Sequence, residues 1–283
     1  MELKTVNLYA FFGLQKREEM AGVLTCYIQK TDPEITAKRL RPAILILPGG
    51  GYGHVSARES EPVALRLLAA GFSVFSLRYT VAPARGVFPA ALREAAMAMR
   101  YIRENAAEME VDASHVAAIG FSAGGHLCGM LGTMYDCPEV ADLGSAALLR
   151  PDALGLCYPV VVSWGNTHSG SFDNLCGEDA ALRQRLSLDN RVRPDMPPAF
   201  LWHTRDDSCV PCRNSLLLAA AMEAANVDFA LHLYRNGQHG LSTADVQAYP
   251  VPAVPRVSWD VPGWIDAMCH FFRELGFVEQ DEA

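Results

Sequence analysis

The chain has 283 residues, half of them hydrophobic, which is enough apolar material for one large core. Its formal net charge is -8, and it contains no run of lysine or arginine. The charge pattern therefore lacks the basic surface of a protein that binds nucleic acid or an anionic membrane, and a small molecule or a neutral polymer is the expected partner.

The N-terminal residues 1–13 lack the charged and apolar regions of a signal peptide. No later stretch approaches the roughly 18 consecutive apolar residues of a membrane-spanning helix. We therefore expect a cytoplasmic protein. The eight cysteines are spread along the chain, which predicts reduced and mostly buried thiols. The sequence leaves homo-oligomerisation open.

Short apolar runs alternate with helix-like segments from residue 42 onward, a pattern typical of a mostly parallel sheet with helices on both faces. Residues 22–29 predict an earlier strand with no helix before the next one, so the N-terminal edge of the sheet should be antiparallel. We expect about eight strands in a single domain of residues 1–283. The other predicted strands are residues 43–47, 73–79, 115–119, 154–158, 199–203 and 229–234. The predicted helices are residues 61–70, 90–105, 125–134, 216–225 and 264–275.

Residues 160–198 interrupt this alternation. They contain a charged, helix-like piece around residues 179–186, but the rest is irregular. A connection this long inside a compact domain is usually functional. We expect an excursion or a small lid over the carboxyl end of the sheet.

The segment Gly120-Phe-Ser-Ala-Gly124 places a serine between two glycines where an apolar strand gives way to a helix. In such a nucleophile elbow the turn is tight, so the residues two before and two after the serine must be small. Ser122 is therefore a candidate nucleophile. The backbone N–H of Ala123 is a candidate donor to the oxyanion of a tetrahedral intermediate.

A serine hydroxyl needs a histidine base and an acid that orients the base. His239 follows the predicted strand 229–234 and is flanked by glycine-rich sequence. Asp206 and Asp207 both follow strand 199–203, and spacing alone favours Asp207 only moderately. Histidines within predicted strands, including His203, are expected to be structural.

Four segments together resemble the α/β-hydrolase-fold serine esterases, and more narrowly the acetyl xylan esterase and feruloyl esterase-like group. They are Pro48-Gly-Gly-Gly-Tyr, Gly120-Phe-Ser-Ala-Gly-Gly-His-Leu, Asp207-x-x-Val-Pro and Gly237-x-His-Gly. The resemblance implies an α/β-hydrolase fold with Ser122 as nucleophile, Asp207 as acid and His239 as base. It also implies that the backbone N–H groups of Gly50, Gly51 and Ala123 form the oxyanion hole.

Polar and aromatic residues expected near the carboxyl end of the sheet are candidates for substrate contacts, although each could equally anchor a loop. They are Tyr52, His54, Trp164 and His168. The Cys-x-x-Cys pair Cys209 and Cys212 could form a redox switch beside Asp207, but no thioredoxin-like pattern surrounds it and two ordinary thiols are the preferred interpretation.

The predicted function is that of a serine carboxylic ester hydrolase, which forms an acyl-enzyme and removes short acyl groups, acetyl above all, from carbohydrates. The expected substrate is a small-molecule or oligosaccharide ester, with no cofactor and no metal. One alternative is a peptidase or amide hydrolase of the same fold, since the same three residues can cleave both bonds. The other is a non-catalytic binding module.

Overall fold

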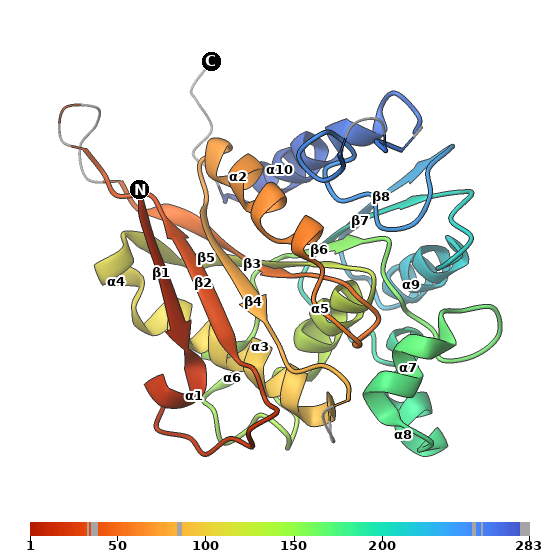
Figure 1. Ribbon diagram of the computed structural model, residues 1–283, viewed down its shortest axis with the longest axis horizontal. Coiled ribbons are helices and arrows are strands. Elements are labelled where there is room, and N and C mark those ends of the chain that lie inside the picture. Colours follow the sequence, from red (N-terminus) through yellow and green to blue (C-terminus); the bar gives the residue numbers. More distant parts are fainter. Residues whose placement is uncertain (33, 35–38, 84–86, 251–252, 256, 278–283) are drawn as a thin grey trace.

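The computed structural model of the protein describes residues 1–32, 34, 39–83, 87–250, 253–255 and 257–277 (Figure 1). Its centre is one eight-stranded sheet with the strand order β1-β2-β4-β3-β5-β6-β7-β8. Strand β2 is antiparallel to both of its neighbours, and β3 to β8 are parallel. The strands are β1 (Glu2–Asn7), β2 (Val23–Ile28), β3 (Arg41–Leu47), β4 (Ser73–Arg78), β5 (Val111–Phe121), β6 (Leu154–Cys157), β7 (Ala199–Thr204) and β8 (Phe229–Tyr234). The expected mostly parallel sheet with an antiparallel N-terminal edge is confirmed.

Helices cover both faces of this sheet (Figure 1). The longer ones are α2 (Glu61–Ala69), α3 (Val87–Glu104), α5 (Ala123–Met134), α7 (Ser169–Cys176), α9 (Arg213–Ala224) and α10 (Trp264–Glu274). Shorter ones are α1 (Leu8–Phe11), α4 (Ala106–Met109), α6 (Ala146–Leu149) and α8 (Ala180–Arg185), with 3-10 turns η1 (Ala57–Glu59), η2 (Leu188–Asn190) and η3 (Val261–Gly263). No helix within the described residues is long and apolar enough to cross a membrane.

The two faces of the sheet have separate hydrophobic cores. In β3, Leu45 and Leu47 belong to the core that includes α3, α5 and α9, whereas the intervening Ile46 belongs to the core that includes α2 and α10. Successive side chains of a strand point to opposite faces. A strand with both faces covered is therefore apolar at every position, which is why β3 and its parallel neighbours could be recognised in the sequence.

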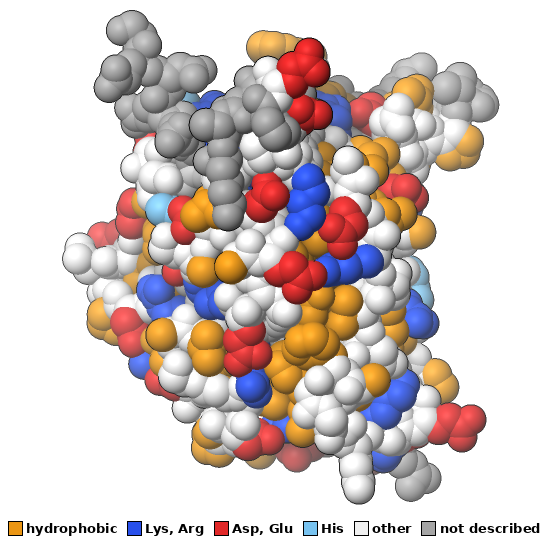
Figure 2. Space-filling model, turned by 90° about the vertical axis from the view of Figure 1, so that its left-hand side faces the viewer, with side chains coloured by type: hydrophobic (Ala, Val, Ile, Leu, Met, Phe, Trp, Pro, Cys, Tyr) orange, Lys and Arg blue, Asp and Glu red, His pale blue; other side chains and the backbone are white. Residues whose placement is uncertain are grey.

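Strand β1 was not among the predicted segments. It pairs only with β2, and its side chains alternate between half-buried and exposed, with Leu3 61% exposed. The side of the molecule that carries β1 shows charges of both signs around a stretch of exposed hydrophobic side chains (Figure 2). Because an edge strand is buried so little, its sequence carries no continuous apolar run.

Residues 160–198 contain α7, α8 and η2, of which only the α8 region was predicted. Helix α7 has the sequence SGSFDNLC, in which serine, glycine, aspartate and asparagine favour turns over helix interiors. The imidazole of His168 caps α7, because its Nδ1 accepts a hydrogen bond of 3.2 Å from the Ser171 backbone N–H. That the segment acts as a lid stays a prediction.

His126 on α5 connects three parts of the chain. Its Nδ1 lies 2.9 Å from the Tyr52 hydroxyl, and its Nε2 lies 2.8 Å from the backbone oxygen of Leu186. A carbonyl oxygen only accepts, so Nε2 carries the proton and Nδ1 accepts from the tyrosine. The neutral ring thus ties the glycine-rich loop after β3 to the segment 160–198.

We predict that His126 makes the stability of the fold depend on pH. Burial lowers the pKa of His126 from 6.5 to about 4, whereas the unfolded chain takes up this proton below its usual pKa. The stabilisation is therefore complete above pH 6.5 and is lost as the pH falls towards 4. The free energy of unfolding, measured with urea, should fall by about 2 to 3 kcal/mol more in the wild type than in His126→Gln between roughly pH 7 and pH 4.5. Parallel pH curves for the two proteins would contradict this.

Candidate active site

The turn between β5 and α5 holds Ser122 in a strained conformation. Its backbone angles are φ 54° and ψ -118°, which a residue with a Cβ rarely adopts. A Cβ at Gly120 would lie 2.1 Å from the backbone oxygen of Gly124, and a Cβ at Gly124 would lie 2.0 Å from the backbone oxygen of Leu47. Only glycine fits at both positions, as expected for a nucleophile elbow.

The structure brings Ser122, His239 and Asp207 together from the ends of three different strands. Ser122 Oγ lies 2.8 Å from His239 Nε2, and His239 Nδ1 lies 2.6 Å from Asp207 Oδ2. The serine is 7% exposed. The three side chains thus form a continuous hydrogen-bonded row that ends at an accessible hydroxyl.

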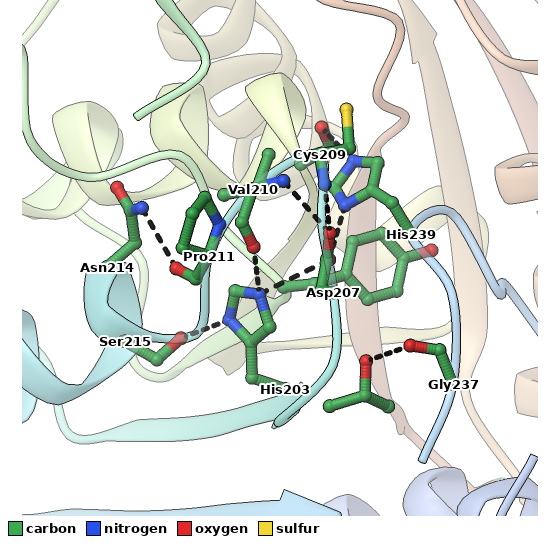
Figure 3. Close-up of polar contacts among 12 residues, drawn as sticks. His203, Asp207, Cys209, Val210, Pro211, Asn214, Ser215, Gly237 and His239 are labelled. Carbon is green, nitrogen blue, oxygen red and sulfur yellow. Dashed lines mark hydrogen bonds and ion pairs between the residues drawn. The ribbon is translucent and has the colours of Figure 1, made fainter. Parts of the chain in front are cut away.

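Asp207 lies between two histidines (Figure 3). Its Oδ1 accepts hydrogen bonds of 2.9 Å from the backbone N–H groups of Cys209 and Val210. Burial by itself raises the pKa of the Asp207 carboxyl, but hydrogen bonds from His203, His239 and the Val210 backbone outweigh it and hold the pKa well below its usual range. Asp207 is therefore ionised and can only accept, so His239 must carry its proton on Nδ1 and leave Nε2 free to accept from Ser122.

His203 contacts Asp207, which was not predicted from the sequence. It is fully buried on β7, with Nδ1 2.8 Å from Ser215 Oγ and Nε2 2.8 Å from the backbone oxygen of Val210. The same Nε2 lies 3.4 Å from Asp207 Oδ2 (Figure 3). The predicted structural role thus includes support of the carboxylate. The available signal was its place at the end of the strand whose loop carries the acid.

Asp206 binds the histidine loop instead of the histidine itself. Its Oδ1 accepts a 2.6 Å hydrogen bond from the Gly237 backbone N–H, while the Thr204 hydroxyl donates to the Gly237 backbone oxygen at 2.7 Å. These contacts hold the loop that presents His239. The two adjacent acids therefore have different partners.

The glycine-rich loop after β3 is held from both sides. The Gly49 N–H donates to Glu59 Oε2 at 2.8 Å, and the Asn174 side chain donates to the Gly51 backbone oxygen at 2.9 Å. The backbone N–H groups of Gly50, Gly51 and Ala123 make no hydrogen bond to any residue that the structure describes. These three donors are therefore available to a substrate oxygen.

A buried pair, Glu59 and Tyr158, lies beneath the site and was not predicted. The Tyr158 hydroxyl donates to Glu59 Oε1 at 2.7 Å, and the Tyr158 ring packs edge-on against the His239 ring with centroids 5.1 Å apart. Glu59 thus connects the glycine loop, through Gly49, with the packing of the histidine. Nothing in the local sequence marks Glu59, because its partners lie far along the chain.

A cavity of about 430 Å³ opens at Ser122. Of the four predicted substrate contacts, His54 and His168 line it. Tyr52 is fully buried with its hydroxyl on His126, and Trp164 lies outside the cavity wall, with its ring nitrogen 3.1 Å from Asp189. The wall contains no aliphatic side chain among the residues described and consists of Gly50, Gly51, Gly53, His54, Ser56, Arg58, Glu59, Ser122, His168, Gly170, Asn174, Cys209, His239 and Gly240.

Cys209 is exposed in this wall, and both Cys209 and Cys212 are free thiols. Burial, followed by the nearby Asp207 carboxylate, raises the pKa of the Cys209 thiol, which disfavours the reactive thiolate.

In the part of the chain that the structure describes, no group of three or more His, Cys, Asp and Glu is arranged to hold a metal ion.

Known proteins resemble this chain in sequence and in fold. A family profile described as BD-FAE matches residues 31–147. The chain is 35% identical over 214 residues to "Endo-1,4-beta-xylanase B" of Butyrivibrio fibrisolvens, which covers 72% of this chain and 33% of that protein. It is 28% identical over 237 residues to "Acetylxylan esterase" of Xylanibacter ruminicola, which covers 81% of this chain and 45% of that protein. The chain thus spans between a third and a half of the length of these curated relatives.

Among solved structures, the acetyl ester-xyloside bifunctional hydrolase from Caldicellulosiruptor lactoaceticus superimposes with a TM-score of 0.77 at 36% sequence identity, covering 91% of this chain and 89% of that one. The chain therefore belongs to the α/β-hydrolase-fold esterase family, in its acetyl xylan esterase and feruloyl esterase-like group.

We predict that Gly124→Ala strongly destabilises the protein. The new Cβ would overlap backbone atoms of Leu47 and Pro48 that no rotamer change can move. The free energy of unfolding should fall by about 3 kcal/mol or more. Gly263→Ala is the matched control, because a Cβ there has nothing within 4 Å, and it should change stability by no more than about 1 kcal/mol. Equal stability of the two variants, measured by urea unfolding, would contradict the steric account of the elbow.

Proposed function

We propose that this protein is a serine carboxylic ester hydrolase that works through an acyl-enzyme and removes short acyl groups, acetyl above all, from carbohydrates. The observation that carries the proposal is the 2.8 Å contact between Ser122 Oγ and His239 Nε2, with His239 in turn held by Asp207. A hydroxyl next to an oriented, unprotonated imidazole nitrogen is an activated nucleophile.

The first half-reaction transfers the acyl group to the enzyme. His239 Nε2 takes the proton of Ser122 as the serine oxygen attacks the ester carbon. The negative charge that develops on the carbonyl oxygen is stabilised by the N–H groups of Gly50, Gly51 and Ala123, which need not be reoriented for it. His239 then returns the proton to the leaving alcohol.

The second half-reaction uses water in place of the alcohol. His239 removes a proton from the water as it attacks the acyl-serine, and the same three N–H groups hold the second oxyanion. The bond between the acyl carbon and Ser122 Oγ then breaks, and His239 returns the proton to Ser122 Oγ, which releases the carboxylic acid and restores the free serine. Throughout, the Asp207 carboxylate stabilises the protonated imidazole and keeps its ring in one orientation.

The lining of the cavity favours an ester with a short acyl group and a polar alcohol. A long fatty acyl chain packs against aliphatic side chains, and the described wall has none: besides glycines it consists of Ser, His, Asn, Arg, Glu and Cys residues. Sugar hydroxyls can hydrogen-bond to such groups. Relatives named acetylxylan esterase and acetyl ester-xyloside hydrolase are consistent with this choice of substrate.

We predict that Ser122→Ala lowers kcat for p-nitrophenyl acetate on the order of 10⁶-fold while the protein stays folded, because the nucleophile is lost. Ser56→Ala is the matched control. Ser56 lies in the same cavity wall but is not the hydroxyl that hydrogen-bonds to His239, so this variant should retain activity within about tenfold. Circular dichroism checks the fold of both. Activity of Ser122→Ala comparable to that of the wild type would refute the proposed function.

A further inference from the structure

Arg58 is held at the mouth of the cavity by contacts at both its ends. It lies in η1 and lines the cavity with an exposed side chain. Its backbone oxygen accepts a hydrogen bond from the Ser242 hydroxyl. Its guanidinium carbon lies 4.8 Å from the centre of the Tyr249 ring, and the Tyr249 hydroxyl donates to the backbone oxygen of Gly240. The guanidinium is thereby placed against the loop that carries His239.

This positive charge is not neutralised within the described part of the protein. Among the residues that the structure describes, the Arg58 guanidinium contacts the Tyr249 ring but makes no ion pair and no hydrogen bond. Its neighbour Glu59 is occupied, because its two carboxylate oxygens accept from the Gly49 N–H and the Tyr158 hydroxyl. In a chain with a net charge of -8, an oriented and unpaired guanidinium beside the nucleophile is a ready partner for an anion.

We propose that Arg58 is a specificity residue that binds a carboxylate on the alcohol half of the substrate, so that the preferred esters are short acyl esters of acidic sugars. This rests on the proposed ester hydrolysis and adds the class of alcohol to it. A guanidinium presents paired N–H donors in the plane that a carboxylate matches.

The position of Arg58 relative to His239 indicates that the carboxylate it binds lies on the alcohol half of the ester and not on the acyl half. His239 Nε2 must reach the leaving oxygen to protonate it, so the alcohol lies beside the histidine loop. Gly240 directly follows His239, and Arg58 Nη2 lies 3.8 Å from the place that a Cβ at Gly240 would occupy. The carbonyl oxygen of the ester points instead to the N–H groups of Gly50, Gly51 and Ala123.

The test compares matched esters that differ in one charge. Mono-acetylated methyl glucuronoside and mono-acetylated methyl glucoside differ by a carboxylate in place of a hydroxymethyl group on the alcohol half. The p-nitrophenyl esters of succinate and butyrate differ by a carboxylate in place of a methyl group on the acyl half. For each pair, kcat and KM are measured at low and at high salt.

The wild type should prefer the acetylated glucuronoside by about tenfold in kcat/KM, mainly through KM, since the contact is present in both ground and transition states. Arg58→Gln should lose this preference, measured as the ratio of kcat/KM for the two esters within that variant. Arg58→Lys should keep part of it, and high salt should weaken it. Arg39→Gln removes the same charge just before β3, at the opposite end of the sheet, and should keep the full preference.

Different results would contradict the role of Arg58 and the proposed ester hydrolysis. Hydrolysis of the neutral esters without any preference for the glucuronoside, or a preference that survives in Arg58→Gln, overturns the role of Arg58 and leaves ester hydrolysis standing. A preference confined to the succinate ester overturns the assignment to the alcohol half. Absence of hydrolysis of every ester overturns the proposed function and this inference with it.

Discussion

The close approach of the β5–α5 turn to the end of β3 is the constraint on which the rest of the site depends. Two positions, Gly120 and Gly124, have no room for a Cβ, and the residue between them takes an unfavourable positive φ. Such strain costs about 1 to 3 kcal/mol and persists only where the surrounding structure imposes it. Here it lifts Ser122 out of the sheet and leaves the first N–H of α5 free beside its hydroxyl.

Once the serine is placed, the other components meet it because parallel strands end at the same edge. The glycine loop follows β3, Asp207 follows β7 and His239 follows β8. Their loops are further fixed by buried polar contacts. His203 supports the acid, Asp206 holds the histidine loop, and Glu59 with Tyr158 connects the glycine loop to the ring of His239. The site is therefore arranged before any substrate arrives, which is the requirement for electrostatic stabilisation of an oxyanion.

The parts of this arrangement that were predictable from the sequence are those with a local signature. Apolar runs identify β3 and β7, glycines identify the elbow, and the order of Ser122, Asp207 and His239 follows from their positions after successive strands. Features that depend on distant partners were not predictable. His203 and Glu59 are recognisable only once the loops are folded against one another, and β1 is too exposed to carry an apolar pattern. Tyr52 was a candidate substrate contact, but its side chain is fully buried and its hydroxyl binds His126. Its backbone has a positive φ, which the sequence did not predict.

The account rests on Ser122 forming a covalent acyl intermediate, and trapping this intermediate tests it most directly. The enzyme is mixed with excess p-nitrophenyl acetate, stopped with acid during turnover and digested, and the peptides are examined by mass spectrometry. The account predicts one acetyl group on the peptide that contains Ser122, assigned to the serine by fragmentation and absent from Ser122→Ala. Continued release of p-nitrophenol with no acetyl group on Ser122, or with the acetyl group on another side chain, would contradict it.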